Sequence, residues 1–184
     1  MESKYKFRLS QLQKIEIAQN LIDILDKDAN ITGQTKKFIG DWIITGPKEK
    51  RKVFFDVWDI VLKSYLPTNR PLLFRTCDRI GRNEKIASFT GRLESARMFS
   101  NGKGFLIICD TNESLKFENI LYKPGEYKHT FYPLVEVLHK AKNAGGWGFS
   151  DRLLNEYIRE DEYIMRINIE KIYHFKWYQN KAEN

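Results

Sequence analysis

The spacing of apolar residues changes once along the chain, between Pro67 and Pro71. Before this point, apolar residues recur at steps of three and four, which is the period of one face of an α-helix. After it, they come in short runs bounded by glycine, proline and aspartate, which is typical of β-strands. Helices that precede a block of strands predict an α+β fold with an antiparallel or mixed sheet, rather than a doubly wound α/β fold.

Three helices are expected before Pro67. Ser10 can cap the first of them, and a second, short helix is expected over 36–44. Pro47 can open the third at its first helical position, where the missing N–H costs little. The apolar faces of the first and third helices are Ile15, Ala18, Ile22 and Leu25, and Phe54, Val57, Val61 and Tyr65.

The segments after Pro71 predict mainly strands. The expected strands are 71–77 (PLLFRTC), 85–90 (KIASFT), 104–110 (GFLIICD), 115–122 (LKFENILY), 163–169 and 172–178. Helices are expected over 93–99 and 132–142. The glycine-rich segment 143–151, NAGGWGFSD, is expected to be a mobile loop.

The composition is that of a folded domain with an affinity for anions. At 184 residues and 42% hydrophobic residues, the chain suits one domain with a sizeable core. The net charge of +7 favours nucleic acid, an anionic surface or a phosphate-bearing cofactor as partner. Residues 1–70 hold 13 basic and 9 acidic residues and the remainder holds 18 and 15, so the charge is dispersed and no basic tail is expected.

Cysteine and histidine usage predicts neither disulfides nor a metal site. Cys77 and Cys109 form no CxxC pair, and His129, His139 and His174 stand at no zinc-ligand spacing. The first ten residues, MESKYKFRLS, contain no apolar signal-peptide core, and no run approaches the ~18 apolar residues of a membrane span. We therefore expect a soluble cytoplasmic protein with no metal and no membrane partner.

Three acidic residues, Glu160, Asp161 and Glu162, stand directly before the expected strand 163–169. On an extended chain, residues two apart share a face, so Glu160 and Glu162 are expected to point the same way. One carboxylate of such a pair can stabilise a developing cation while the other takes a proton from a nucleophile. The alternative interpretation is a polar turn before an edge strand.

Two other strands contain polar side chains that suit a site. Arg75 lies in the middle of an apolar strand, where its planar guanidinium can bind phosphate or carboxylate, or form a buried ion pair. Ser88 and Thr90 share a face of the strand 85–90. Their hydroxyls can hold a carboxylate or meet ribose hydroxyls, although hydroxyls at a strand end often only cap the next helix.

An arginine on one strand, Ser-x-Thr on a second and Glu-x-Glu before a third, in this order, resembles the R-S-E class of mono-ADP-ribosyltransferases. The stretches that carry the resemblance are PLLFRTC, SFTGRLESARMF followed by GFLIICD, and EDEYIM, within residues 67–178. The small ADP-ribosyltransferases of tailed bacteriophages are the most similar members. The resemblance implies a split-sheet α+β fold with NAD in a central cleft, and no metal.

The resemblance also implies roles for individual residues. Arg75 would hold the phosphates of NAD, and Ser88, followed by Thr90, would orient the catalytic glutamate and the nicotinamide ribose. Glu162 would bind the ribose and stabilise the oxocarbenium-like transition state, while Glu160 would prepare the acceptor. The aromatic residue that stacks on nicotinamide is one of Phe89, Phe99 and Phe117.

Other parts of the chain match the family less closely. Thr76 stands where the family often has a glycine after the strand arginine. The segment from Trp147 to Tyr157 would be the acceptor-facing loop. Residues 67–184 would form the catalytic core, and residues 1–66 are expected to be a helical region packed on it.

Three functions remain open at this point. The Glu-x-Glu pair favours transfer of ADP-ribose from NAD to protein arginine, as in a toxin or phage effector. Trp147, Phe149 and Tyr157 would suit the same chemistry on RNA or DNA, because aromatic rings stack on bases. The third is a non-catalytic basic binding module, antitoxin or inhibitor, and an enzyme of this kind could itself have an antitoxin or inhibitor as partner.

Overall fold

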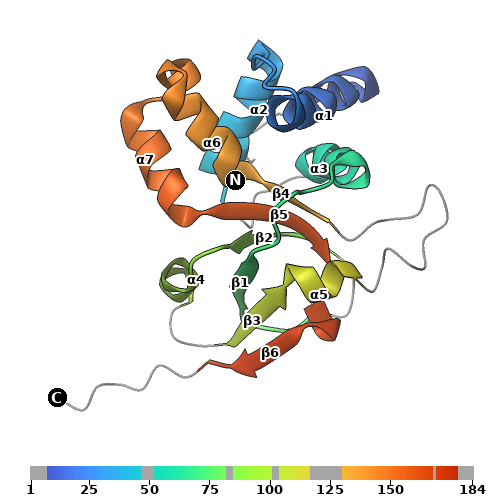
Figure 1. Cartoon of the computed structure of the whole chain (residues 1–184), viewed down its shortest axis with the longest axis vertical. Helices are drawn as coiled ribbons and strands as arrows, with labels where there is room; N and C mark the ends of the chain where they lie inside the picture. Colours follow the sequence, from blue (N-terminus) through green and yellow to red (C-terminus); the bar gives the residue numbers. More distant parts are fainter. Residues whose placement is uncertain are drawn as a thin grey trace, which may run out of the picture.

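The computed structural model describes residues 8–46, 52–81, 85–100, 104–116, 130–167 and 169–177. Three helices come first, namely α1 (Gln11–Asp26), α2 (Gly33–Ile44) and α3 (Lys52–Ser64), and a sheet follows them (Figure 1). Ser10 caps α1 as expected, with its hydroxyl accepting from the amide of Gln13 while the Gln13 side chain accepts from Ser10 N–H. The structure describes nothing of Pro47.

The strands of the described chain form one sheet in the order β4-β5-β2-β1-β3-β6, and every pairing in it is antiparallel. Helices α4 (Leu93–Phe99), α5 (Thr111–Lys116), α6 (Leu134–Asn143) and α7 (Asp151–Glu160) lie between strands in the chain. The α+β class is therefore confirmed. The strands are β1 (Leu72–Cys77), β2 (Lys85–Thr90), β3 (Phe105–Asp110), β4 (Phe131–Pro133), β5 (Glu162–Ile167) and β6 (Tyr173–Lys176).

The sheet divides into two halves between β1 and β2. These two strands are in register only at Phe74 and Thr90, whereas β2 pairs with β5 and β1 with β3 along their full lengths. Figure 1 shows the half β4-β5-β2 above and the half β1-β3-β6 below it. Because the strands separate beyond a single paired position, side chains of β1 can reach the main chain of β2.

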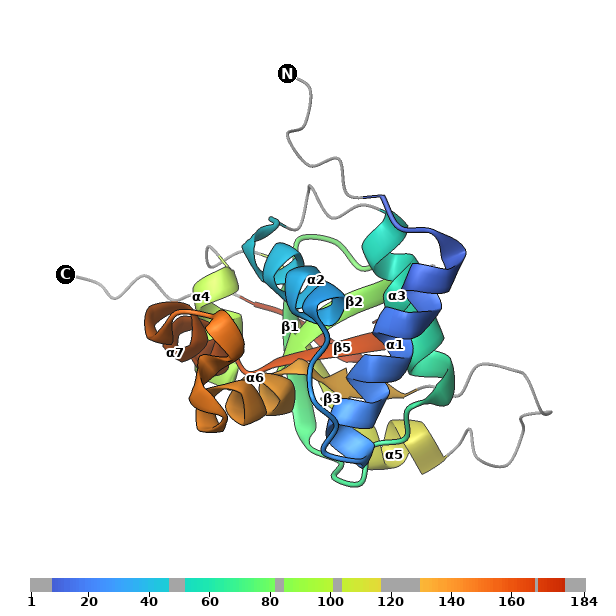
Figure 2. The ribbon, with the colours of Figure 1, turned by 90° about the horizontal axis from the view of Figure 1, so that it is seen from above.

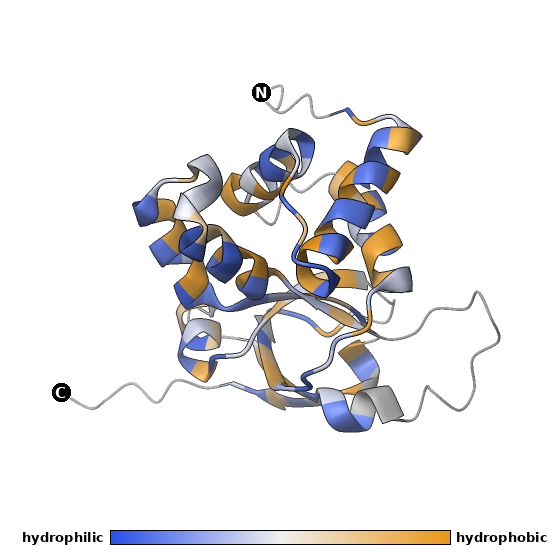
Figure 3. Ribbon diagram, turned by 45° about the horizontal axis from the view of Figure 1, so that its top comes forward, coloured by the Kyte–Doolittle hydropathy of each residue, from blue (hydrophilic) through white to orange (hydrophobic). Residues whose placement is uncertain are grey.

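Two hydrophobic cores lie on opposite faces of β2 and β5. One core joins α1, α2, α3, α6 and α7 with Ile164 of β5, and the other holds Phe89 and Met165. The helices have both hydrophobic and hydrophilic sides (Figure 3), as expected of helices that cover a sheet. The N-terminal helices thus share a core with the C-terminal part of the chain. Seen from above, α1, α2 and α3 lie over the sheet (Figure 2).

The expected helices over 93–99 and over the first third of the chain are present, but other expectations were wrong. Helix α7 occupies most of the segment expected to be the acceptor-facing loop, because Ser150 caps it and Leu153, Leu154, Tyr157 and Ile158 give it an apolar face. The expected helix over 132–142 begins only after strand β4. The expected strand over 115–122 begins inside α5, and its remainder lies outside the described residues.

Among the described residues, no helix has the length and apolar character needed to span a bilayer.

Candidate functional site

Glu162 is the first residue of β5, and its carboxylate accepts a hydrogen bond from the hydroxyl of Ser88 on β2. The distance between Ser88 Oγ and Glu162 Oε1 is 2.5 Å. Glu162 is in register with Thr90, and Ser88 with Ile164, so Ser88 and Glu162 are diagonal neighbours on one face of the sheet. The antiparallel pairing of β2 with β5 thus places the segment that contains Ser88 next to the segment that contains Glu162.

Trp42 of α2 is a second hydrogen-bond donor to the same carboxylate. Its Nε1 lies 3.2 Å from both Oε1 and Oε2 of Glu162. The Trp42 side chain is only 1% exposed and belongs to the core that the N-terminal helices form. Glu162 is therefore held by one donor from the sheet and one from the N-terminal helical region.

Arg75 of β1 lies close to Ser88 and Glu162. Its Nη1 donates to the main-chain carbonyl of Ser88 at 2.6 Å. Burial lowers the pKa of Arg75 from its ordinary value, while Cys77 and Glu162 act in the opposite direction. The Nε atom of Arg75 is buried and has no hydrogen-bond partner. A buried guanidinium with an unused donor suits an anionic ligand.

The C-terminus of α7 is held by hydrogen bonds from the last residue of β2 and from the segment that follows β2. The last carbonyls of a helix lack partners within the helix. Here the hydroxyls of Ser95 and Thr90 donate to the carbonyls of Arg159 and Glu160, at 3.1 and 2.7 Å, and Gly91 N–H donates to the Asp161 carbonyl at 3.2 Å. The Thr90 hydroxyl thus supports the main chain beside the acids, and Thr90 is only 4% exposed.

The turn between Glu160 and Glu162 is not extended. Glu160 ends α7, and Asp161 adopts the left-handed conformation with φ of 53°. The expectation that the chain is extended here, so that Glu160 and Glu162 share one face of a strand, was therefore wrong. A Cβ at Gly91 would lie 2.4 Å from Asp161 Oδ2, so a larger residue there would displace the Asp161 carboxylate. Burial raises the pKa of Asp161 above its ordinary value, which Arg92 and His139 oppose.

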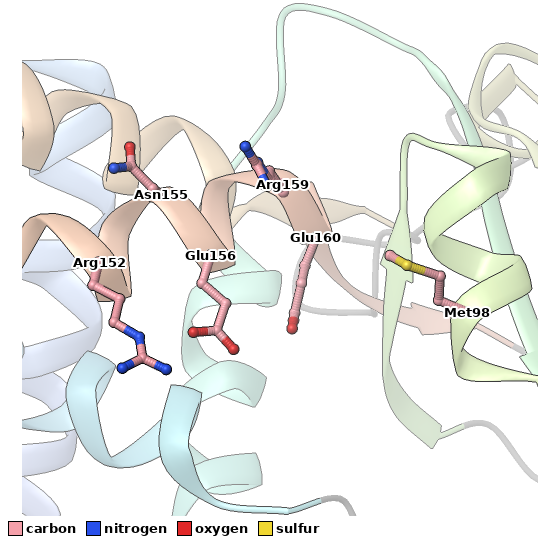
Figure 4. A pocket seen from close by; sticks show the side chains of 6 residues that line it. All are labelled: Met98, Arg152, Asn155, Glu156, Arg159 and Glu160. Carbon is pink, nitrogen blue, oxygen red and sulfur yellow. The ribbon is translucent and has the colours of Figure 1, made fainter.

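A cavity of about 550 Å³ lies beside Glu160 (Figure 4). In the figure, the side chains of Glu156 and Glu160 project to the same side of α7, and Met98 of α4 lies across from Glu160. Burial raises the pKa of Tyr157, and Glu160, Glu156 and Glu162 add to this rise. Tyr157 therefore lies within electrostatic range of both acids of the Glu-x-Glu motif. The lining residues are Met98, Arg152, Asn155, Glu156, Arg159 and Glu160.

The structure does not bring every candidate residue to this site. Phe89 is 2% exposed and lies in the core on the face opposite Ser88, so it does not share a face with Ser88 and Glu162. Phe99 ends α4 and is 60% exposed. Trp147 packs against the core of the N-terminal helices as a half-buried side chain. Phe117 lies outside the described residues.

Trp42 is the residue that sequence reasoning missed. It lies in the segment 1–66, which matches no motif, and is separated from Glu162 by 120 positions. Its place on an apolar helix face predicts a core residue, and it is one. The direction in which its N–H points depends on how α2 packs over β5, which its own segment does not specify.

Within the ranges that the structure describes, no group of three or more His, Cys, Asp or Glu side chains is arranged to hold a metal ion. Comparison with family models, curated proteins and solved structures finds no match to this chain.

Proposed function

We propose that the chain is an NAD-dependent mono-ADP-ribosyltransferase that transfers ADP-ribose to a macromolecular acceptor and releases nicotinamide. The observation that carries this proposal is the hydrogen-bonded series Arg75–Ser88–Glu162. These residues come from three strands and from the three segments that resemble the R-S-E class. A chance resemblance of short motifs gives no reason for the Ser88 hydroxyl to contact Glu162 while the Arg75 side chain binds the Ser88 main chain.

The arrangement suits cleavage of the glycosidic bond between ribose C1′ and the nicotinamide nitrogen. Nicotinamide leaves with the bonding electrons, so its ring becomes neutral and positive charge develops on the ribosyl group. Glu162 is a fixed carboxylate that can stabilise this charge. A nucleophile then forms a new bond to C1′ and loses a proton. Glu160, at the end of α7, is the acid that we assign to receiving or directing that proton.

The surroundings of Arg75 fit the diphosphate of NAD. The guanidinium uses Nη1 to hold the Ser88 carbonyl, and its buried Nε remains without a partner. A phosphate oxygen would satisfy that donor and offset the cost of burying the charge. The split between β1 and β2, next to these residues, also supports the finer assignment of an ADP-ribosyltransferase-like sheet.

Protein arginine is the acceptor that we favour. Glu160 borders an open cavity, where its carboxylate can pair with a guanidinium in the bidentate manner. The aromatic residues that suited a nucleic acid, Trp147 and Tyr157, are half-buried against the core of the N-terminal helices. Rings held in this way have less surface available for stacking on bases.

The test is transfer of labelled ADP-ribose from NAD into lysate separated into protein and nucleic-acid fractions. We expect label in protein, sensitive to hydroxylamine as arginine adducts are, and none when Glu162→Gln replaces the wild type. Label that nuclease removes would move the acceptor to RNA or DNA. Absence of both label and nicotinamide release would overturn the proposal in favour of a non-catalytic binding module.

A further inference from the structure

The N-terminal helical region makes direct contact with the proposed catalytic carboxylate. The only such hydrogen bond in the described chain comes from Trp42, whose Nε1 is 3.2 Å from each oxygen of Glu162. Helix α2 lies above the half of the sheet that contains β5 in Figure 1 and over the sheet in Figure 2. The contact therefore joins the segment 1–66, which matches no motif, to the carboxylate of Glu162.

The direction of the Trp42 N–H is set by packing. The indole ring makes edge contacts with Phe54, Phe55 and Trp58, with ring centroids 5.8, 6.2 and 5.5 Å away. A ring held by three aromatic neighbours in a close-packed core has little freedom to turn. Its single polar atom is thus a preorganised donor aimed at Glu162.

Trp58 shows what a purely structural tryptophan looks like in this core. It is buried, and it packs against Phe38, Trp42 and Tyr132. Its Nε1, however, has no hydrogen-bond partner. The two neighbouring tryptophans therefore share burial and aromatic packing, and they differ in whether the N–H contacts the candidate site.

We propose that Trp42 is a positioning residue, through which α2 fixes the orientation of the Glu162 carboxylate. The inference rests on the proposed function of Glu162. A carboxylate offers about four acceptor positions. Ser88 and Trp42 occupy part of this capacity, so positions remain for a substrate hydroxyl. The N-terminal helical region is accordingly part of the active site.

Loss of the Trp42 donor leaves the charges around Glu162 in place. The other groups that interact with Glu162 are Arg75 on β1 and Tyr157 on α7, and both remain in a Trp42 variant. A Trp42 variant therefore tests the restraint on the orientation of the carboxylate.

The experiment compares Trp42→Phe with Trp58→Phe in the full chain, using NAD cleavage as the assay. Both changes keep an aromatic ring in the same core and remove one indole N–H. We expect Trp42→Phe to lower kcat by about tenfold to a hundredfold, with the KM for NAD unchanged. Trp58→Phe removes one packing neighbour of Trp42 but no donor to Glu162, so it should lower kcat less than Trp42→Phe.

Equal loss of kcat in both variants, or a Trp42→Phe enzyme with the kcat of the wild type, would overturn the positioning role. Comparing the thermal midpoints of the two variants identifies any loss that arises from unfolding. Trp58→Phe also removes a buried donor that has no partner, which offsets part of the cost of replacing a buried indole with a smaller ring.

A second readout separates this inference from the proposed function. The chain contains four tryptophans, so its indole ¹⁵N–¹H signals can be assigned by substitution. We expect the Trp42 signal to move more than the Trp58 signal in Glu162→Gln, because only the Trp42 N–H donates to Glu162. A Trp42 signal that follows Glu162 in a chain without NAD cleavage overturns the catalytic assignment but keeps the contact. An active enzyme whose Trp42 signal ignores Glu162 overturns the positioning role alone.

Discussion

Ser88 Oγ lies 2.5 Å from Glu162 Oε1, although the two residues are 74 positions apart in the chain. Pairing of β2 with β5 produces this contact, because it sets Thr90 opposite Glu162 and Ser88 one diagonal step away on the same face. The contact gives a carboxylate a fixed orientation, which is what a site that stabilises positive charge requires.

The first prediction concerns the Ser88 hydroxyl. Ser88→Ala removes one of the two donors that hold Glu162, and a hydrogen bond to a charged group contributes about 1.5–3 kcal/mol. We expect kcat for NAD cleavage to fall by about tenfold to a hundredfold. Ser100→Ala is the matched control, because its hydroxyl donates to the Arg97 carbonyl within its own helix end. Similar rates for the two variants would contradict a role for Ser88 in holding Glu162.

The second prediction concerns recognition of NAD by Arg75. Lysine keeps the charge but loses the planar fork that matches phosphate, so Arg75→Lys should raise the KM for NAD by about tenfold or more. Steady-state kinetics over a range of NAD concentrations measures this change. Arg79→Lys, at an exposed position beyond β1, is the control and should behave as the wild type. A lowered kcat at unchanged KM would show that Arg75 acts on the Ser88 main chain instead.

The third prediction separates the two acids of the Glu-x-Glu motif. Glu160→Gln should abolish transfer to arginine and retain nicotinamide release, because water needs less guidance than a guanidinium to attack C1′. Transfer to an arginine-rich protein and NAD hydrolysis are measured in parallel. The control is Glu94→Gln, which makes the same charge change at an exposed position of α4. Loss of both reactions in Glu160→Gln would contradict separate roles.

The fourth prediction is a pH-dependent change in stability at Asp161. Burial raises the pKa of this carboxyl in the folded chain above its model-peptide value of 3.8. Its contribution therefore favours folding below pH 3.8 and is lost as pH rises through the folded-state pKa. Asp161→Asn removes the charge, and asparagine accepts the left-handed conformation that this position requires.

We expect Asp161→Asn to have a higher free energy of unfolding than the wild type at neutral pH, and no advantage at pH 3. Because the side chain is 19% exposed and Arg92 lies 3.9 Å away, the gain should be below about 1 kcal/mol. Urea unfolding across this pH range measures it. An advantage that is independent of pH would contradict the assignment of the effect to ionisation.

Local sequence pattern predicted much of the fold because the signals there are short-range. The capping box at Ser10 and the apolar run of β3 are examples, each readable within a few residues. The segment from Trp147 to Tyr157 was misread because the glycine-rich stretch 143–148 stands at its start and charged residues follow. Its apolar face stabilises a helix only when Leu154 and its neighbours are buried against α6 and the core.

Part of the candidate site could also be predicted from local sequence pattern. Arg75, Ser88 and Glu162 are polar residues in or next to apolar strands, and such residues are conspicuous in a sequence. The structure assigns the Thr90 hydroxyl to the carbonyl of Glu160, which depends on a turn that no local pattern specifies. Trp42 is an apolar residue on an apolar helix face, so nothing in its own segment distinguishes it from a core residue.

The most direct measurement of the central claim is release of nicotinamide from NAD by the purified chain, compared with Glu162→Gln and with Glu113→Gln as an exposed control on α5. The account predicts release by the wild type and by Glu113→Gln, and a loss of about a hundredfold or more in Glu162→Gln at unchanged NAD affinity. Equal rates for Glu162→Gln and the wild type would contradict the assignment of Glu162, and a wild type that neither binds nor cleaves NAD would contradict the proposed function itself.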